Sequence, residues 1–160
     1  MSSIAVYPGT FDPPTCGHLD IITRSAKVFD TLYVAVLNNS DKTPIFSVDE
    51  RKNMLSRITN NLNNVVITSF NGLLADYAKQ INANVIVKGL RAVSDYEYEY
   101  QMALINNKIN PAADTFFLTT TAENSFLSSS VVKDIARYKG DLTNMVPSEI
   151  QSIVYSKLTE

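Results

Sequence analysis

The stretch YPGTFDPPTCGH, residues 7–18, is the part of the sequence from which the rest is best interpreted. It contains two glycines, the adjacent prolines Pro13 and Pro14, and the only histidine of the chain. The apolar run Ile4–Tyr7 ends where this stretch begins, and apolar residues at helical spacing follow the stretch. In parallel α/β sheets, ligands bind where strands end and helices begin. This loop is therefore the expected ligand site, with Gly9 allowing close approach of the backbone to the ligand.

The helix that follows this loop predicts what kind of ligand the site takes. A helix N-terminus offers unpaired N–H groups and a partial positive charge, which together favour a phosphate group. His18 falls in the first helical turn, where a cationic imidazole is disfavoured, so we expect a neutral ring that still donates one N–H. Most isolated histidines have no such role, but this position favours one. Neither GxxxxGK[ST] nor GxGxxG occurs, so the loop is of another phosphate-binding type.

Short apolar runs alternate with helical segments along the whole chain. The runs expected to form buried strands are Ile4–Tyr7, Leu32–Leu37, Val65–Phe70, Val85–Val87 and Thr115–Leu118. Helical spacing is seen between them, for example at Leu74, Tyr77, Ala78 and Ile81. This alternation predicts an α/β fold: a single domain over residues 1–160, with an open parallel sheet covered by helices on both faces, as in Rossmann-like proteins.

Local signals predict several helix ends. SVDE at 47–50 and SEIQ at 148–151 match the capping-box pattern. Gly140 is expected to end a helix that begins near Ser129. The segment DYEYEYQMALINNKI, residues 95–109, is expected to be helical, with tyrosines on two faces. Such a helix could be buried against a partner subunit as well as the core, or it could expose its tyrosines; both interpretations are open.

Composition excludes several classes of protein. The chain has 160 residues, a net charge of −2 and 45% hydrophobic residues, as expected of a globular domain without a general affinity for nucleic acid or anionic membranes. One cysteine, Cys16, permits neither an internal disulfide nor a multi-cysteine metal site. Neither a membrane span nor a signal-peptide pattern is found, so a cytoplasmic protein is expected.

Three blocks of the sequence resemble one known family. GTFDPPTCGH resembles the GxFDPxTxGH signature of the HIGH-type nucleotidyltransferase superfamily. KGLRAVSDYEYEYQMA and NSFLSSSVVKDIARYKGD resemble the other two blocks of the bacterial phosphopantetheine adenylyltransferases. The resemblance spans residues 4–158 and implies adenylyl transfer from ATP to 4′-phosphopantetheine, giving dephospho-coenzyme A and pyrophosphate. It also implies a homohexamer, feedback inhibition by coenzyme A, and Mg²⁺ bound mainly through the ATP phosphates.

The resemblance also assigns residues to roles. Catalytic roles are implied for His18, Lys42, Arg91 and Ser129. Nucleotide binding is implied for Thr10, Phe11, His18, Gly89, Leu90, Arg91, Glu99 and the segment Asn124, Ser125, Phe126, Leu127, Ser128, Ser129 and Ser130. Binding of the second substrate is implied for Thr10, Lys42, Leu74 and Lys88. No residue is assigned as a metal ligand.

Three positions depart from the family pattern: Cys16 stands where asparagine is common, Lys88 where arginine is usual, and Asn124 where an aromatic residue is frequent. Lys88 would keep the attraction for phosphate but lose bidentate geometry. The sequence also shows no evident general base or nucleophilic triad, and adenylyl transfer needs neither, because the attacking phosphate oxygen is already anionic. Two other hypotheses are a cytidylyltransferase of the same superfamily, which more often carries His-x-Gly-His, and a non-catalytic nucleotide sensor.

Overall fold

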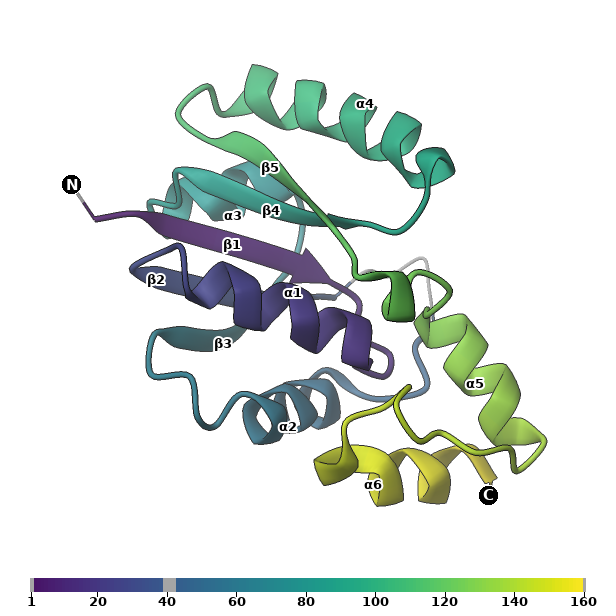
Figure 1. Ribbon diagram of the computed structural model, residues 1–160. Coiled ribbons are helices and arrows are strands. Elements are labelled where there is room, and N and C mark those ends of the chain that lie inside the picture. Colours follow the sequence, from purple (N-terminus) through teal and green to yellow (C-terminus); the bar gives the residue numbers. More distant parts are fainter. Residues whose placement is uncertain (1, 39–42, 160) are drawn as a thin grey trace.

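Five strands form one sheet in the computed structural model, which describes residues 2–38 and 43–159 (Figure 1). They are β1 (Ile4–Gly9), β2 (Thr31–Leu37), β3 (Val65–Phe70), β4 (Val85–Leu90) and β5 (Asp114–Thr119). The spatial order is β3-β2-β1-β4-β5, and all neighbouring strands are parallel. All five predicted strands are confirmed, and β1 and β4 continue beyond their predicted ends.

Helices cover both faces of the sheet, as predicted. One layer contains α1 (Cys16–Ala26), α2 (Val48–Ile58), α5 (Ser129–Arg137) and α6 (Ser148–Thr159), whose apolar residues share the larger core cluster. The other layer contains α3 (Leu74–Gln80) and α4 (Val93–Ile109), which pack beside each other. In Figure 1, α5 and α6 lie beyond the carboxyl ends of the strands, so this end of the sheet is enclosed by helices.

The sheet opens between its central strand, β1, and the neighbouring strand β4. β1 pairs with β2 over all of Ile4–Gly9, but with β4 only at Ala5 and Val6. Pro8 of β1 has no N–H with which to continue a ladder. The strand order also reverses between β1 and β4, which is where doubly wound sheets bind their ligands. The topology therefore places a ligand crevice at the carboxyl ends of these two strands.

Two of the predicted helix ends differ from the structure. The capping box at Ser47 and Glu50 is present, but the one predicted at Ser148 is wrong, because Ser148 is the first helical residue and its hydroxyl donates to Glu149. The helix of Ser129 ends at Arg137, and the residue with positive φ is Lys139 rather than Gly140. Gly140 is required for a different reason, since a Cβ there would lie 2.6 Å from the Ile135 side chain.

The segment 95–109 is helical as predicted and forms most of α4. Within the single chain its tyrosines are not buried on two faces. Tyr96 stacks on Tyr100 with ring centroids 5.6 Å apart and packs edge-on against Phe117, while Tyr98 is 64% exposed. The apolar residues of α4 are thus largely left on the surface of the chain.

Candidate active site

A capping box at the start of α1 fixes the state of His18. Thr15 is the N-cap residue, and its hydroxyl oxygen accepts a hydrogen bond from the His18 N–H at 3.3 Å. In return, the Thr15 main-chain N–H donates to Nδ1 of His18 at 3.0 Å. A backbone N–H can only donate, so Nδ1 must be the acceptor, and the neutral ring carries its proton on Nε2. The box therefore leaves a single ring N–H, on Nε2, for a ligand.

His18 is neutral at pH 7, as the sequence predicted, although the physical cause differs. Burial lowers the pKa of His18, the positive charge of Arg91 adds to this effect, and together they bring the pKa to about 4. Protonation of Nδ1 would also break the hydrogen bond from Thr15. The expected cause, repulsion by the helix N-terminus, is not needed to explain a neutral ring.

Phe11 shapes the loop through its backbone and its buried ring. It is only 1% exposed, and its φ of 51° is unusual for a residue other than glycine. The ring packs edge-on against Tyr7 and His18, with centroid distances of 5.5 and 5.0 Å. A Cβ at Gly9 would lie 2.8 Å from this ring, so Gly9 makes room for the side chain of Phe11. The sequence had instead predicted that Gly9 makes room for a ligand.

The two helix N-termini at the crevice differ in how many amides they leave for an anion. In α1 the Cys16 N–H donates to the Met145 carbonyl at 2.9 Å, and the His18 N–H is taken by the cap. In α5, Ser128 is the N-cap residue and accepts from the Val131 N–H at 3.1 Å. Among the described residues no partner takes the amides of Ser129 and Ser130. The start of α5 is therefore the more open anion site.

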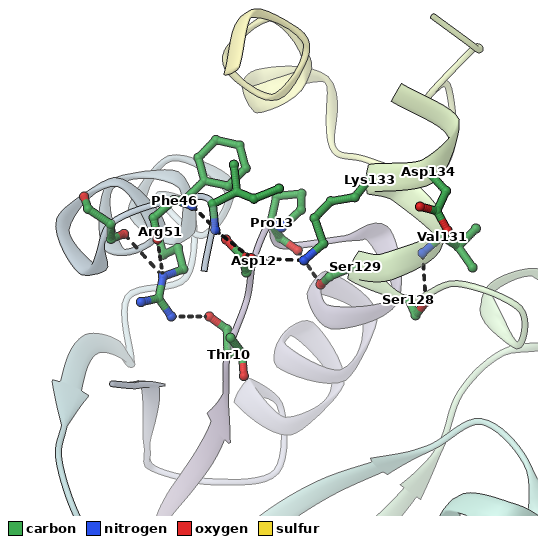
Figure 2. Close-up of polar contacts among 12 residues, drawn as sticks. Thr10, Asp12, Pro13, Phe46, Arg51, Ser128, Ser129, Val131, Lys133 and Asp134 are labelled. Carbon is green, nitrogen blue, oxygen red and sulfur yellow. Dashed lines mark hydrogen bonds and ion pairs between the residues drawn. The ribbon is translucent and has the colours of Figure 1, made fainter. Parts of the chain in front are cut away.

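Ser129 and Ser130, which the resemblance assigns to nucleotide binding, differ in where their hydroxyl groups lie. The Ser129 hydroxyl donates to the Pro13 carbonyl at 2.8 Å and so ties α5 to the loop after β1 (Figure 2). Ser130 is exposed. Contact of Ser129 with a phosphate would thus use its main-chain N–H while the hydroxyl holds the loop.

Asp12 and Lys133 form a buried link that the sequence reasoning missed. Oδ2 of Asp12, a residue that is 3% exposed, lies 3.1 Å from Nζ of Lys133 (Figure 2). Lys133 is one helical turn after Ser129 and faces the same crevice. The spacing of four places Ser129 and Lys133 on one face of α5, but no local pattern indicates the pairing of Lys133 with Asp12.

Arg91 and Glu99 connect the crevice to β4 and α4. Arg91 donates through Nη1 to the Leu127 carbonyl at 3.2 Å and forms an ion pair with Asp95 at 3.2 Å. Nζ of Lys88 lies 3.2 Å from Oε2 of Glu99, although this buried oxygen accepts no hydrogen bond of good geometry from the described residues. Lys88 and Glu99, which the resemblance assigns to different substrates, are thus paired with each other.

These elements enclose a cavity of about 760 Å³ at the carboxyl ends of β1 and β4. Most of the predicted site residues line it: Thr10, Phe11, His18, Gly89, Arg91, Glu99, Asn124, Leu127, Ser128, Ser129 and Ser130. Further lining residues that had been given no role include Tyr7, Asp12, Ile21, Thr43, Pro44, Thr120 and Lys133. Burial raises the pKa of Tyr7, so its hydroxyl stays protonated in the cavity wall.

The remaining predicted residues lie elsewhere. Leu90, Ser125, Phe126, Leu74 and Lys88 are not in the cavity wall. Leu74 begins α3 and packs against the smaller core cluster, and Phe126 is 58% exposed. Lys42 lies outside the described residues.

Among the described residues, no three of His, Cys, Asp and Glu are grouped so that they could hold a metal ion. The carboxylates in the cavity wall are those of Asp12 and Glu99, and each already lies beside a lysine. None of the described helices combines the length and the apolarity that crossing a bilayer requires.

Comparisons with known proteins agree with this architecture. A family model described as Cytidylyltransferase-like matches residues 6–135. Plasmodium falciparum nicotinic acid mononucleotide adenylyltransferase, solved with NaAD, has a similar fold, with a TM-score of 0.66 and 15% identity over 99% of this chain and 95% of that chain. A putative nicotinate-nucleotide adenylyltransferase from Vibrio parahaemolyticus gives a TM-score of 0.68 and 16% identity over the same shares. At these identities the two structures show the fold alone, whereas the family match spans most of the sequence. The chain belongs to the cytidylyltransferase-like family.

Proposed function

We propose that this protein is a pantetheine-phosphate adenylyltransferase, which transfers the adenylyl group of ATP to 4′-phosphopantetheine. The observation that carries the proposal is the neutral His18, held by Thr15 with its proton on Nε2 at a cavity that also contains Arg91 and Lys133. Such fixed donors suit a reaction in which charge moves between phosphate groups. The order of the three sequence blocks supports phosphopantetheine as the acceptor.

The proposed reaction is an in-line displacement at the α-phosphorus of ATP. A phosphate oxygen of 4′-phosphopantetheine forms the new bond to this phosphorus, while the bond to the bridging oxygen of the β-phosphate breaks. The electron pair of that bond leaves with pyrophosphate. Because the attacking oxygen is already anionic, the protein need not remove a proton, and its task is alignment and charge stabilisation.

The residues around the cavity have distinct parts in this proposal. His18 donates from Nε2, and Arg91 contributes a cation, where negative charge accumulates on the leaving pyrophosphate. The amides of Ser129 and Ser130 hold the outer phosphates at the start of α5. We also propose that Mg²⁺ is bound mainly by the ATP phosphates, in keeping with carboxylates that are already beside lysines.

The acceptor is the finer part of the proposal. Leu73, which is 57% exposed, and Leu74 offer apolar surface at the carboxyl edge of the sheet for the pantetheine arm. Lys88, which is paired with Glu99 in the single chain, is the cation that the resemblance assigns to its phosphate. Nicotinic acid mononucleotide is the second candidate acceptor, because both similar folds carry that enzyme's name. The two acceptors differ strongly in shape, so a direct comparison separates them.

The test is pyrophosphate release from Mg·ATP with one acceptor at a time. We expect release with 4′-phosphopantetheine and only background release with nicotinic acid mononucleotide, nicotinamide mononucleotide or no acceptor. Release with nicotinic acid mononucleotide alone would assign the second candidate. CTP with glycerol 3-phosphate tests the cytidylyltransferase hypothesis, and tight ATP binding without turnover would favour a sensor.

We further propose a homohexamer that coenzyme A inhibits. Support for assembly comes from apolar residues of α4 that are exposed in the single chain, namely Val93, Tyr96, Tyr98, Tyr100, Leu104, Ile105 and Ile109. Sedimentation velocity measures the oligomeric state directly. Inhibition is measured by adding coenzyme A to the pyrophosphate assay.

A further inference from the structure

Arg51, near the start of α2, has a buried guanidinium group, and the residue is only 1% exposed. In the described part of the chain, its hydrogen bonds go to four main-chain carbonyl oxygens, those of Thr10, Leu37, Phe46 and Ser47. A buried charge is costly unless its partners remain in place. Arg51 therefore binds main-chain carbonyls inside the protein and is not part of a surface ion pair. The sequence analysis gave Arg51 no role.

The four carbonyls belong to three different segments that meet at the carboxyl edge of the sheet. These are the loop after β1, the end of β2 and the segment before α2. Asp12 holds the last segment from the other side, because its carboxylate accepts from the Phe46 N–H at 2.9 Å and from the Ile45 N–H at 3.1 Å. Figure 2 shows this arrangement, with Arg51 and Asp12 on either side of Phe46. Together the two side chains fix the loop after β1 against α2.

The contact with Thr10 has a consequence for the cavity. Nη1 of Arg51 lies 2.8 Å from the Thr10 carbonyl oxygen, the shortest of the four distances. In a trans peptide the C=O and the following N–H point in opposite directions, so the Phe11 N–H is directed away from Arg51. Thr10 and Phe11 both line the cavity and Arg51 does not. No described residue accepts a hydrogen bond from the Phe11 N–H.

This orientation of the peptide needs support from outside the loop. The φ of 51° at Phe11 is sparsely populated by residues with a side chain, and such conformations persist only where their surroundings impose them. The ring of Phe11 is fixed by Tyr7 and His18, and the carbonyl before it is fixed by Arg51. If the carbonyl were released, the peptide could rotate, and the Phe11 N–H would no longer be held directed away from Arg51.

We propose that Arg51 is a positioning residue that holds the peptide between Thr10 and Phe11 so that the Phe11 N–H is presented to an anionic group of the nucleotide. The proposal rests on the proposed function only in taking ATP as the ligand of the cavity. Arg51 itself touches no substrate. A lysine in its place keeps a charge but offers one ammonium group instead of a planar fork, so it cannot hold the same set of carbonyls.

The test compares Arg51→Lys and Arg51→Met with two controls. Arg57→Met removes the same group from an exposed position on the same helix. Val154→Ala weakens the core at α6, far from Thr10 in sequence, and serves as the control for a loss of stability alone. For each variant, kcat and KM for Mg·ATP are measured by pyrophosphate release, and the Phe11 amide resonance is followed by NMR as Mg·ATP is added.

We expect a large shift of the Phe11 amide resonance in the wild type, and its loss in Arg51→Lys. We also expect at least a tenfold fall in kcat in Arg51→Lys, with both controls within twofold of the wild type. A smaller fall, or a fall that Val154→Ala reproduces at equal stability, would overturn the positioning role. If Arg51→Met does not fold, Arg51→Lys and the wild-type titration still decide, because a wild-type Phe11 amide that ignores bound ATP refutes the proposal. A wild type whose Phe11 responds to ATP but which adenylates no acceptor would refute the proposed function and leave this inference standing.

Discussion

Acidification from pH 7 to pH 5 should destabilise this protein through one residue, His18. It is the only histidine in the chain, and its folded-state pKa is about 4 against an ordinary value of 6.5. The folded protein keeps the ring neutral because burial and Arg91 disfavour the charged form. Carboxylates whose pKa values are lowered, such as those of Asp30 and Glu50, lose their contribution only at more acidic pH.

The sign and the size follow from the two pKa values of His18. Between pH 6.5 and pH 4 the unfolded chain binds a proton that the folded protein does not, so the free energy of unfolding falls as the pH falls. The stabilising contribution is complete above pH 6.5 and lost below pH 4. Proton linkage with these two pKa values lowers the free energy of unfolding by about 2 kcal/mol from pH 7 to pH 5. His18 is partly exposed, so solvent screening makes this figure an upper limit.

The assay is urea unfolding at half-unit steps of pH, at constant ionic strength. The matched variant is His18→Gln, because glutamine at the third helical position can accept the Thr15 N–H hydrogen bond but does not titrate. The wild type should lose stability between pH 7 and pH 5, and the variant should stay level. Equal slopes for the two proteins would refute the reasoning, as would an NMR spectrum with the His18 proton on Nδ1.

Three further outcomes are expected. His18→Ala should lower kcat by a factor that corresponds to roughly 2.7–4 kcal/mol, with a much smaller change in ATP affinity measured by calorimetry, because it removes one fixed donor. Gly9→Ala should cost about 1–3 kcal/mol in urea unfolding, because the new methyl group would lie 2.8 Å from the Phe11 ring; an unchanged midpoint would contradict that packing. Asp12→Asn should destabilise by about 3 kcal/mol, since it leaves Lys133 unpaired in a largely buried setting, and Lys133→Met in the same background should recover part of the loss.

Much of the fold was predictable because its signals are local. The strands follow apolar runs such as Val65–Phe70, and the capping box at Ser47 can be recognised from four adjacent residues. The prediction was wrong at Ser148, where the same four-residue pattern lies one position inside the helix. The local pattern is compatible with a helix that begins at Ser148 or at Glu149. The packing of α6 against α2 and α5 decides that it begins at Ser148.

The candidate site was predictable in part. The loop of residues 7–18 and the serines at the start of α5 were identified from sequence, and the fold brings both to one cavity. Arg51 and Lys133 were missed because each works through a residue far away in the chain, Thr10 in one case and Asp12 in the other. A contact between positions separated by 41 or 121 residues leaves no local pattern in a single sequence.

The sequence by itself determined the alternation of strands and helices, the loop that would carry the site, and the presence of His18 at its end. Hydrophobic periodicity, proline and glycine act over a few residues, so these features are encoded where they occur. Only the tertiary structure decided which ring nitrogen of His18 carries the proton, the orientation of the peptide after Thr10 and the pairing of Lys88 with Glu99. Each of these depends on burial or on a partner from another segment, and burial exists only once the chain has folded.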